Sequence, residues 1–413
     1  MKLRNKNIIQ IAKDAKKTSV ELNKLSTKDK NKILLNIIKS LDKNRNEILE
    51  ANKIDVDNAK NNIKISLLDR LILNNQRIDN MIDSLKILID LKDHIGEIID
   101  EKTLKNGLKL IKKRVPFGVI GVIYESRPNV TIDVASICLK SSSSVILKGG
   151  SEAINTNKIL VKLLNDSCQI KNAFQLIEST DRSITNEILK LNNYIDLIIP
   201  RGGKNLINFV RDNSKVPIIE TGTGNCHIFL DEKYDIKKAI KIIINAKTQR
   251  PSVCNAVEKL LIHENTFGNN IKSIINELKK KNVEIRGCNK INEIEKCKIA
   301  DETDWHTEYL DLIMGIKIVK NVNEAISHIN KYGTKHSEAI LSYNNENIDK
   351  FNNEVDASTV YTNASTRFTD GYEFGMGAEI GISTQKLHAR GPMGLEALST
   401  YKYLITGNGH IRK

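Results

Sequence analysis

The chain has 413 residues, enough for two or three domains with a substantial hydrophobic core. Its formal net charge is +14, but the 64 basic residues are mixed with 50 acidic ones and aromatic residues make up only 5%. Specific nucleic-acid binding is therefore not expected, because no basic stripe is interleaved with aromatic side chains that could stack on bases. The excess positive charge can still attract an anionic substrate.

Cysteine usage and hydropathy narrow the class of protein further. The six cysteines are Cys138, Cys168, Cys226, Cys254, Cys288 and Cys297. They form no CxxC pair, so neither a disulfide framework nor a zinc cluster is expected, and reduced thiols are typical of a cytoplasmic protein. The apolar runs are too short for a membrane span, and the charged N-terminal segment does not resemble a secretory signal.

The first quarter of the chain predicts helices. Ser26-Thr-Lys-Asp29 has the pattern of a helix N-cap, and apolar residues from Ile33 to Leu41 then recur on one helical face. The pattern changes near residue 101, where Asn106-Gly107 lies between alternating flanks. This pair predicts a β-hairpin over residues 101–115.

The middle of the chain predicts strands that alternate with helices. Residues 117–124 form a continuous apolar run with glycines, which is typical of a buried parallel strand. Further strands are expected at 144–148, 173–177 and 195–200, with helices at 132–140 and 151–165. This order predicts an α/β fold with a doubly wound parallel sheet. A second α/β unit is expected from about residue 250, with strands at 258–262, 283–286, 338–342 and 358–361.

Three loops follow strands of the first predicted sheet, at 125–129, 148–152 and 200–204. Ligands of open parallel sheets bind beyond the carboxyl ends of the strands. A glycine-rich turn that opens a helix offers backbone N–H groups to a phosphate, although Gly-Gly pairs also form plain turns. None of the three loops matches GxGxxG, so the usual dinucleotide fingerprint is absent from the sequence.

Cys254 is the residue that most directly indicates chemistry. It lies between an amphipathic apolar run and a strand-like run, with Lys247 and Arg250 a few residues before it. Nearby cations stabilise a thiolate, which is the nucleophilic form of cysteine. A cysteine in such a place can equally be a small packing residue. The residue pattern alone leaves both interpretations open.

Several segments taken together resemble the gamma-glutamyl phosphate reductases, also called glutamate-5-semialdehyde dehydrogenases, of the aldehyde dehydrogenase superfamily. These segments are 115–129, 147–153, 199–203, 245–255 and 375–394. The resemblance covers essentially the whole chain, in the right order and at the right length. It implies an aldehyde dehydrogenase-like fold with a cofactor domain at 1–248, a catalytic domain at 249–362 and a return segment at 363–413. It also implies that the 101–115 hairpin and residues 396–413 form an oligomerisation flap, and hence a homo-oligomer.

The resemblance further implies an activity and a catalytic group. The family reduces L-glutamyl 5-phosphate to L-glutamate 5-semialdehyde with NADPH and releases phosphate, as the second step of proline synthesis. Cys254 would attack the acyl phosphate and form a thioester, with its own backbone N–H and the Asn129 amide facing the oxyanion. Glu220 matches the superfamily's general-base position. It is expected to be structural or to tune the thiol, because phosphate rather than water is the reaction partner.

By the same resemblance, a set of residues is expected to bind NADPH. The set comprises Lys148, Gly149, Ser151, Gly202, Gly203 and Glu308. Lys148 would contact the adenosine ribose, and Glu308 would hold the nicotinamide ribose unless it is a solvated turn carboxylate. Glu152 would repel a 2′-phosphate unless it is turned away. The preference for NADP over NAD therefore rests on the resemblance and not on a residue code.

Charged residues near Cys254 and toward the C-terminus are candidates for the anionic groups of the substrate. Lys247 and Arg250 are the candidates for the phosphate. Arg367 and the segment 388–390 are candidates for the carboxylate, with ordinary surface charge as the alternative. A separate glutamate 5-kinase is expected to supply the acyl phosphate, and no metal is expected. Two rival hypotheses remain: an aldehyde dehydrogenase with another substrate or direction, and a catalytically silent basic binding protein.

Overall fold

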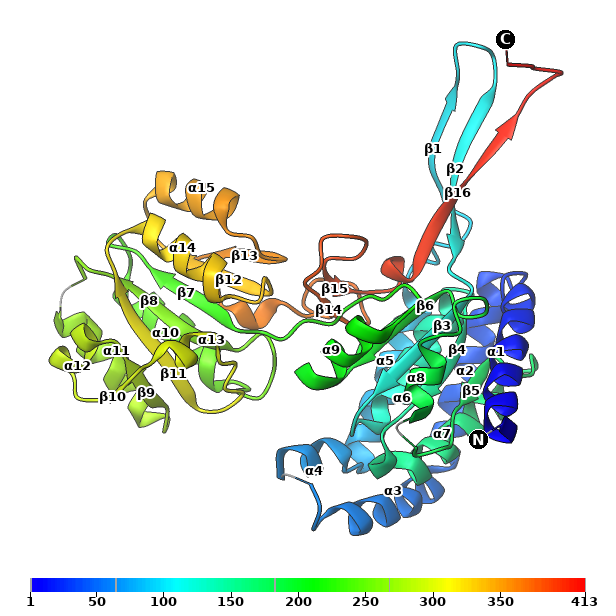
Figure 1. Cartoon of the computed structure of the whole chain (residues 1–413), viewed down its shortest axis with the longest axis horizontal. Helices are drawn as coiled ribbons and strands as arrows, with labels where there is room; N and C mark the ends of the chain where they lie inside the picture. The colour runs from blue at the N-terminus through cyan, green and yellow to red at the C-terminus, as the bar shows by residue number, and fades with distance from the viewer. Residues whose placement is uncertain (1, 64, 182, 267, 413) are drawn as a thin grey trace. The chain divides into compact units, whose positions relative to one another are not determined.

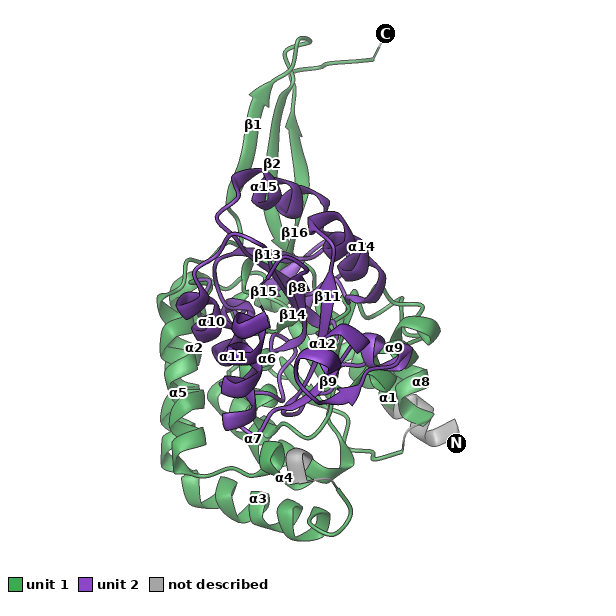
Figure 2. Cartoon of the chain, turned by 90° about the vertical axis from the view of Figure 1, so that its left-hand side faces the viewer, with its two compact units in different colours: residues 1–221, 375–381, 393–413 green, residues 222–374, 382–392 purple. Residues whose placement is uncertain are grey.

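The chain divides into two compact units. The computed structural model describes residues 2–63, 65–181, 183–266 and 268–412. Unit 1 comprises residues 1–221, 375–381 and 393–413, and unit 2 comprises residues 222–374 and 382–392 (Figure 2). The division falls after Thr221 rather than after 248, because β7 (Cys226–Leu230) pairs with strands of the second unit.

The N-terminal part of unit 1 is helical, as the apolar periodicity predicts. Its helices are α1 (Lys2–Leu22), α2 (Thr27–Lys43), α3 (Arg45–Ala59), α4 (Ile65–Leu71) and α5 (Asn75–Asp90). The predicted N-cap is confirmed: Ser26 Oγ accepts the Asp29 N–H at 3.2 Å, and the Asp29 carboxylate accepts the Ser26 N–H at 3.1 Å. Leu34 and Leu41 then bury the apolar face of α2.

Unit 1 contains a parallel sheet in the order β5-β4-β3-β6. Its strands are β3 (Val119–Tyr124), β4 (Ser144–Lys148), β5 (Phe174–Leu176) and β6 (Leu197–Arg201). Its helices are α6 (Pro128–Lys140), α7 (Ile154–Ser167), α8 (Ser183–Ile188) and α9 (Lys204–Asn213), with the short η1 (Ser151–Ala153) before α7. The strand order reverses at β3, which is buried along its whole length. The doubly wound prediction is confirmed, and the reversal lies where such sheets bind ligands.

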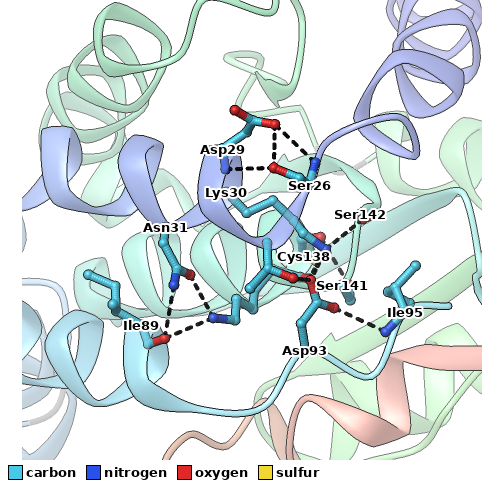
Figure 3. Close-up of polar contacts among 12 residues, drawn as sticks. Ser26, Asp29, Lys30, Asn31, Ile89, Asp93, Ile95, Cys138, Ser141 and Ser142 are labelled. Carbon is cyan, nitrogen blue, oxygen red and sulfur yellow. Dashed lines mark hydrogen bonds and ion pairs between the residues drawn. The ribbon is translucent and has the colours of Figure 1, made fainter. Parts of the chain in front are cut away.

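Two buried lysines, Lys30 and Lys140, join the helices of unit 1. Figure 3 shows Lys30 among its polar partners. Lys30 Nζ donates to the Lys140 carbonyl at 3.1 Å and to Ser142 Oγ at 3.1 Å, and it pairs with the Asp93 carboxylate. Lys140 Nζ donates to the Ile89 carbonyl at 3.0 Å. Each ammonium therefore satisfies carbonyl oxygens at the end of a neighbouring helix, which is where helices leave acceptors unpaired.

Strands from both ends of the chain form a separate antiparallel sheet in unit 1, in the order β1-β2-β16. β1 (Ile98–Thr103) and β2 (Lys109–Pro116) are the predicted hairpin, and Gly107 adopts a φ of +86° in its turn. β16 (Ser399–Thr406) pairs with the full length of β2. Figure 1 shows the three strands extending as one long arm. Lys413, the last residue of the expected flap, lies outside the described residues.

Unit 2 is built on a parallel sheet in the order β10-β9-β11-β8-β7-β12-β13. The other strands are β8 (Val257–His263), β9 (Glu284–Gly287), β10 (Lys298–Ile299), β11 (Ile313–Val319), β12 (Ser337–Leu341) and β13 (Thr359–Thr362). The four predicted strands are confirmed as β8, β9, β12 and β13. The sequence interpretation missed β7, β10 and β11, and in β11 Gly315 and Lys317 interrupt the apolar run.

Helices cover this sheet and its core. They are α10 (Ile236–Thr248), α11 (Gly268–Lys280), α12 (Asn289–Ile294), α13 (Glu302–His306), α14 (Val322–Tyr332) and α15 (Asn345–Glu354). Short elements follow: η2 (Thr366–Phe368), η3 (Glu396–Leu398), and β14 (Gly381–Ser383) paired with β15 (Gly391–Met393). One buried cluster packs α10 and α11 on the sheet, and another packs α14 and α15. Within the described residues, none of the helices combines the length and apolarity needed to span a bilayer.

Candidate active site

Cys254 lies in a turn of residues 249–256 between α10 and β8, here called the Cys254 turn. Its side chain is half-buried, and all six cysteines, which lie among the described residues, are thiols rather than disulfides. Hydrogen bonds from other segments of unit 2 hold the turn in place. The Cys226 thiol donates to the Cys254 carbonyl at 3.1 Å, and the Asn255 amide donates to the Thr369 carbonyl at 2.8 Å. Thr366 Oγ1 donates to the Asn255 carbonyl at 2.7 Å.

Two arginines accompany the thiol. Arg250 is exposed on the Cys254 turn, and Arg367 lies on η2, where its Nε donates to Gln249 Oε1 at 2.7 Å. Partial burial lowers the pKa of Arg367, Arg250 lowers it further, and Cys254 and Asp370 act in the opposite direction. Arg367 is therefore close enough to Arg250 and to the Cys254 sulfur to interact electrostatically with both. This arrangement suits an anionic nucleophile that reacts with an anionic substrate.

Lys247 does not share this exposed position. Its side chain is fully buried, and Nζ donates to Glu258 Oε2 at 3.1 Å. Burial lowers the pKa of Lys247 and Glu258 raises it. The chain direction explains the difference from Arg250, since Lys247 belongs to the last turn of α10 and points into the core of unit 2, whereas Arg250 follows the helix end. Only Arg250 of the two is available at the surface of the turn.

Glu308 is tied to the Cys254 turn through Gly224. Its Oε1 accepts the Gly224 N–H at 2.7 Å. The backbone of Gly224 lies directly against that of Cys254: a Cβ added at Gly224 would come within 1.4 Å of the Cys254 carbonyl oxygen. Only glycine allows this approach. The structure therefore brings Glu308 and the thiol-bearing turn together within unit 2.

The turn after β4 carries the candidates for the adenosine end of a cofactor. Lys148 is buried at the strand end, where Nζ donates to the Gly149 carbonyl at 3.1 Å, and Ser151 is exposed. Burial lowers the pKa of Lys148, and Glu152 raises it. Glu152 Oε1 accepts the Ser126 N–H at 2.7 Å and also the Ser126 hydroxyl. The loop after β3 thus holds the Glu152 carboxylate, which still acts on the charge of Lys148.

The turn after β6 carries a different arrangement. The Gly203 N–H, at the start of α9, donates to Glu125 Oε2 at 2.8 Å, and this carboxylate also lies against Gly202. A carboxylate of the chain itself therefore occupies the end of the helix where an anion is favoured. The roles of Gly202 and Gly203 in cofactor binding remain predictions, and a phosphate there would have to displace Glu125.

Asn129 is the second residue of α6 in unit 1. Its Nδ2 donates to Asp133 Oδ2 at 3.0 Å, one helical turn further on. Burial raises the pKa of Asp133 to about 6, and the bond from Asn129 opposes that shift. The oxyanion role of Asn129 stays a prediction. The structural role of Glu220, which lies in the same unit next to the boundary at Thr221, also stays a prediction.

The candidates gather at two places, one in each unit. Unit 2 joins the Cys254 turn to Arg250, Arg367 and Glu308, and unit 1 gathers the other cofactor candidates at the carboxyl edge of its four-stranded sheet. Arg390, in the segment 388–390, instead forms an ion pair of 2.7 Å with Asp356.

The sequence interpretation missed three residues of unit 2 that lie near the Cys254 turn or hold the turn that carries Glu308. Gly224 packs on the Cys254 backbone, and Glu258 and Lys259 lie buried at the start of β8. Two adjacent charges inside the apolar run of a strand are a signal that could have identified the last two.

Comparison with known proteins agrees with this geometry. The aldehyde dehydrogenase family model matches residues 2–287. The chain is 53% identical to a protein of Clostridium botulinum (strain Eklund 17B / Type B) named gamma-glutamyl phosphate reductase, over 98% of this chain and 100% of the relative. The crystal structure of the gamma-glutamyl phosphate reductase of Thermotoga maritima matches with a TM-score of 0.96 and 52% identity, over 98% of this chain and 99% of that one.

A more distant structure supports the fold alone. An acetylating aldehyde dehydrogenase of Geobacillus thermoglucosidasius matches with a TM-score of 0.72 at 18% identity, over 100% of this chain and 98% of that one. The expected aldehyde dehydrogenase-like α/β fold is thus confirmed, and this family implies a nicotinamide cofactor. The chain is an oxidoreductase that belongs to the gamma-glutamyl phosphate reductases, within the aldehyde dehydrogenase family.

Proposed function

We propose that the chain reduces L-glutamyl 5-phosphate to L-glutamate 5-semialdehyde with NADPH and releases phosphate, the second step of proline synthesis from glutamate. The proposal is supported above all by the half-buried Cys254 in a turn that two arginines flank, in a chain about half identical to relatives named for this substrate over nearly their full length. Unit 1 is assigned to cofactor binding and unit 2 to the thiol chemistry.

The chemistry is nucleophilic acyl substitution at Cys254. The thiolate attacks the acyl carbon and forms a carbon–sulfur bond. The bond between the acyl carbon and the bridging oxygen of the phosphate then breaks, and inorganic phosphate leaves with that electron pair. The product on the enzyme is a thioester. NADPH, when bound, would supply the hydride for the reduction of this thioester. Cys254 would then leave the substrate carbon as a thiolate, which releases the aldehyde. The backbone N–H of Cys254 and the amide of Asn129 are assigned to the oxyanion.

Arg250 and Arg367 are assigned to the anionic groups of the substrate. A guanidinium offers fixed paired donors to a phosphate or carboxylate, and it eases the departure of a dianion. The buried Lys247 is not assigned to this role, because Glu258 already pairs with it. Arg250→Ala is expected to lower turnover by about tenfold or more, as the loss of a charge-assisted contact implies. Unchanged turnover would remove Arg250 from the phosphate site.

The residues of unit 1 fit a nicotinamide dinucleotide. Lys148 and Ser151 offer an ammonium and a hydroxyl to a ribose or phosphate, and Ser126 holds the Glu152 carboxylate. The preference for NADP over NAD is proposed from the family and not from a residue of this turn, because a carboxylate beside Lys148 opposes a 2′-phosphate. In unit 2, Glu308 is assigned to the nicotinamide ribose. Glu220 is assigned a structural role, because a base that activated water would waste the thioester.

The proposed function also implies partners for the chain. The arm of β1, β2 and β16 is assigned to a homo-oligomer contact, since Tyr403 and Ile405 are exposed on it. A separate glutamate 5-kinase would supply the acyl phosphate, and the protein is assigned to the cytoplasm.

The decisive experiment runs the reaction in reverse. We expect the purified chain to reduce NADP in the presence of glutamate semialdehyde only when phosphate is added. Cys254→Ser should abolish this activity, whereas Cys288→Ser, a change at another half-buried cysteine of unit 2, should leave it intact. Activity without phosphate would instead favour an aldehyde dehydrogenase with another substrate. The absence of any turnover together with retained anion binding would favour a catalytically silent binding protein.

A further inference from the structure

A row of buried polar residues crosses the sheet of unit 2. Glu338 on β12 is the register partner of His227 on β7, His227 is the partner of Lys259 on β8, and Lys259 is the partner of Gly315 on β11. The first three side chains are fully buried. Cross-strand partners point to the same face of a sheet, so the row runs across one face from Glu338 on β12 to Gly315 on β11.

Gly315 ends this row and makes room for Lys259. A Cβ added at Gly315 would lie 2.7 Å from Lys259 Cδ and 3.3 Å from a ring carbon of Trp305. The lysine side chain therefore passes over the glycine and reaches beyond β11. Its Nζ donates to the Thr307 carbonyl at 2.7 Å.

The same ammonium also contacts an aromatic ring. Lys259 Nζ lies 4.2 Å from the centroid of Tyr309, and the Arg286 guanidinium lies 5.0 Å from that centroid. The Tyr309 hydroxyl donates to Asp304 Oδ1 at 2.9 Å. Two cations and one hydrogen bond thus fix the ring in place.

The turn of residues 307–310 is held by a second buried charge. Glu258 Oε1 accepts the Leu310 N–H at 3.3 Å, while its Oε2 accepts Lys247 Nζ. The register of β8 against β7 shifts at Glu258, so strict alternation is broken there, and the Glu258 and Lys259 side chains both bond to this turn. Leu310 has a φ of +55°, a region that a bulky residue keeps only when surrounding contacts enforce it.

Glu308 lies inside this held turn. Its carboxylate accepts the Gly224 N–H, and the Gly224 backbone packs on Cys254. A chain of direct contacts therefore runs from Lys259 through the turn to Glu308, and from Glu308 through Gly224 to the nucleophile. Any shift of the turn would change the placement of Glu308 relative to the sulfur.

We propose that Lys259 is a positioning residue, which holds the 307–310 turn so that Glu308 stays in register with the Cys254 turn for hydride transfer. The proposal rests on the assignment of Glu308 to the nicotinamide ribose. A displacement of about 1 Å in such a constellation can cost on the order of 10²-fold in rate, so a single lost contact beneath the turn is sufficient for a measurable effect.

The test compares two variants near the turn with a matched control. Lys259→Met keeps the length of the side chain but removes the donor and the charge. Gly315→Ala keeps Lys259 but places a methyl group in its path. Lys140→Met is the control, because Lys140 is an equally buried lysine that donates to a helix-end carbonyl in unit 1.

We expect both turn variants to weaken NADP binding, measured by calorimetric titration, and to lower kcat/KM for the cofactor by about 10- to 100-fold. Lys140→Met should lower Tm while both cofactor parameters stay within about twofold of wild type. The proposal is overturned if Lys259→Met and Gly315→Ala lower Tm as the control does but leave NADP binding and kcat/KM unchanged.

Failure of the proposed function would look different, because it would show in the wild-type chain as missing phosphate-dependent turnover. If Lys259→Met does not fold, Gly315→Ala decides the matter by the same two measurements.

Discussion

The contact between Gly224 and the Cys254 turn leads to the sharpest prediction. In Gly224→Ala, the new Cβ would lie 1.4 Å from the Cys254 carbonyl oxygen and 2.7 Å from its Cα. Real Cβ atoms stay at least 3.0 Å from such neighbours, so one of the two backbones must move by about 1.6 Å. These neighbours are backbone atoms, which cannot rotate away as the end of a side chain would.

This displacement has two expected consequences. A shift of more than 1 Å at the nucleophile should lower kcat by about 10²-fold or more, which corresponds to about 3 kcal/mol of lost transition-state stabilisation. The Gly224 N–H would also lose its alignment with Glu308 Oε1, now 2.7 Å away. Overpacking should lower the free energy of unfolding by about 1–3 kcal/mol.

The assay measures phosphate-dependent NADP reduction, the rate of alkylation of Cys254 by iodoacetamide, and Tm. Gly268→Ala is the control, since a Cβ at Gly268 meets nothing within 4 Å. We expect the control to match wild type in kcat and Tm. A Gly224→Ala protein that folds and keeps kcat within about twofold of wild type would refute the claim that this close approach positions the nucleophile.

Three further predictions concern the cofactor, the arm and acid stability. Ser126→Ala should remove the hydroxyl bond to the Glu152 carboxylate, while the bond from the backbone N–H remains, and weaken NADP binding by about fivefold, the equivalent of one hydrogen bond, with little change for NAD; equal weakening of both cofactors would contradict it. Ile405→Lys should reduce the oligomeric mass measured by light scattering, whereas Val20→Lys on α1, where the wild-type residue is also 59% exposed, should not. Burial lowers the pKa of His336 from its ordinary value of 6.5 to about 4. As the pH falls below 6.5, His336 therefore binds a proton in the unfolded chain but stays neutral in the folded one. Stability present above that pH is therefore lost, by about 2 kcal/mol between about pH 7 and about pH 5, and urea unfolding should show a smaller loss in His336→Gln.

Local patterns were sufficient for most of the elements. The capping pattern at Ser26 depends only on neighbours in the chain, and so does the Asn106-Gly107 turn, and both are confirmed. The continuous apolar run at 117–124 was sufficient by itself to predict a buried parallel strand, and it forms β3. The boundary between the units was harder, because it depends on which strands pair, and β7 pairs with residues far along the chain.

By itself, the sequence determined the α/β class, the family, and the thiol on which the proposed chemistry depends, because these reside in runs of adjacent residues. Tertiary structure alone decided the environment of that thiol. It buried Lys247 against Glu258, left Arg250 exposed, and brought Arg367 from more than a hundred residues away to the same turn. Such contacts follow from strand order and helix packing, which charge spacing along the chain does not specify.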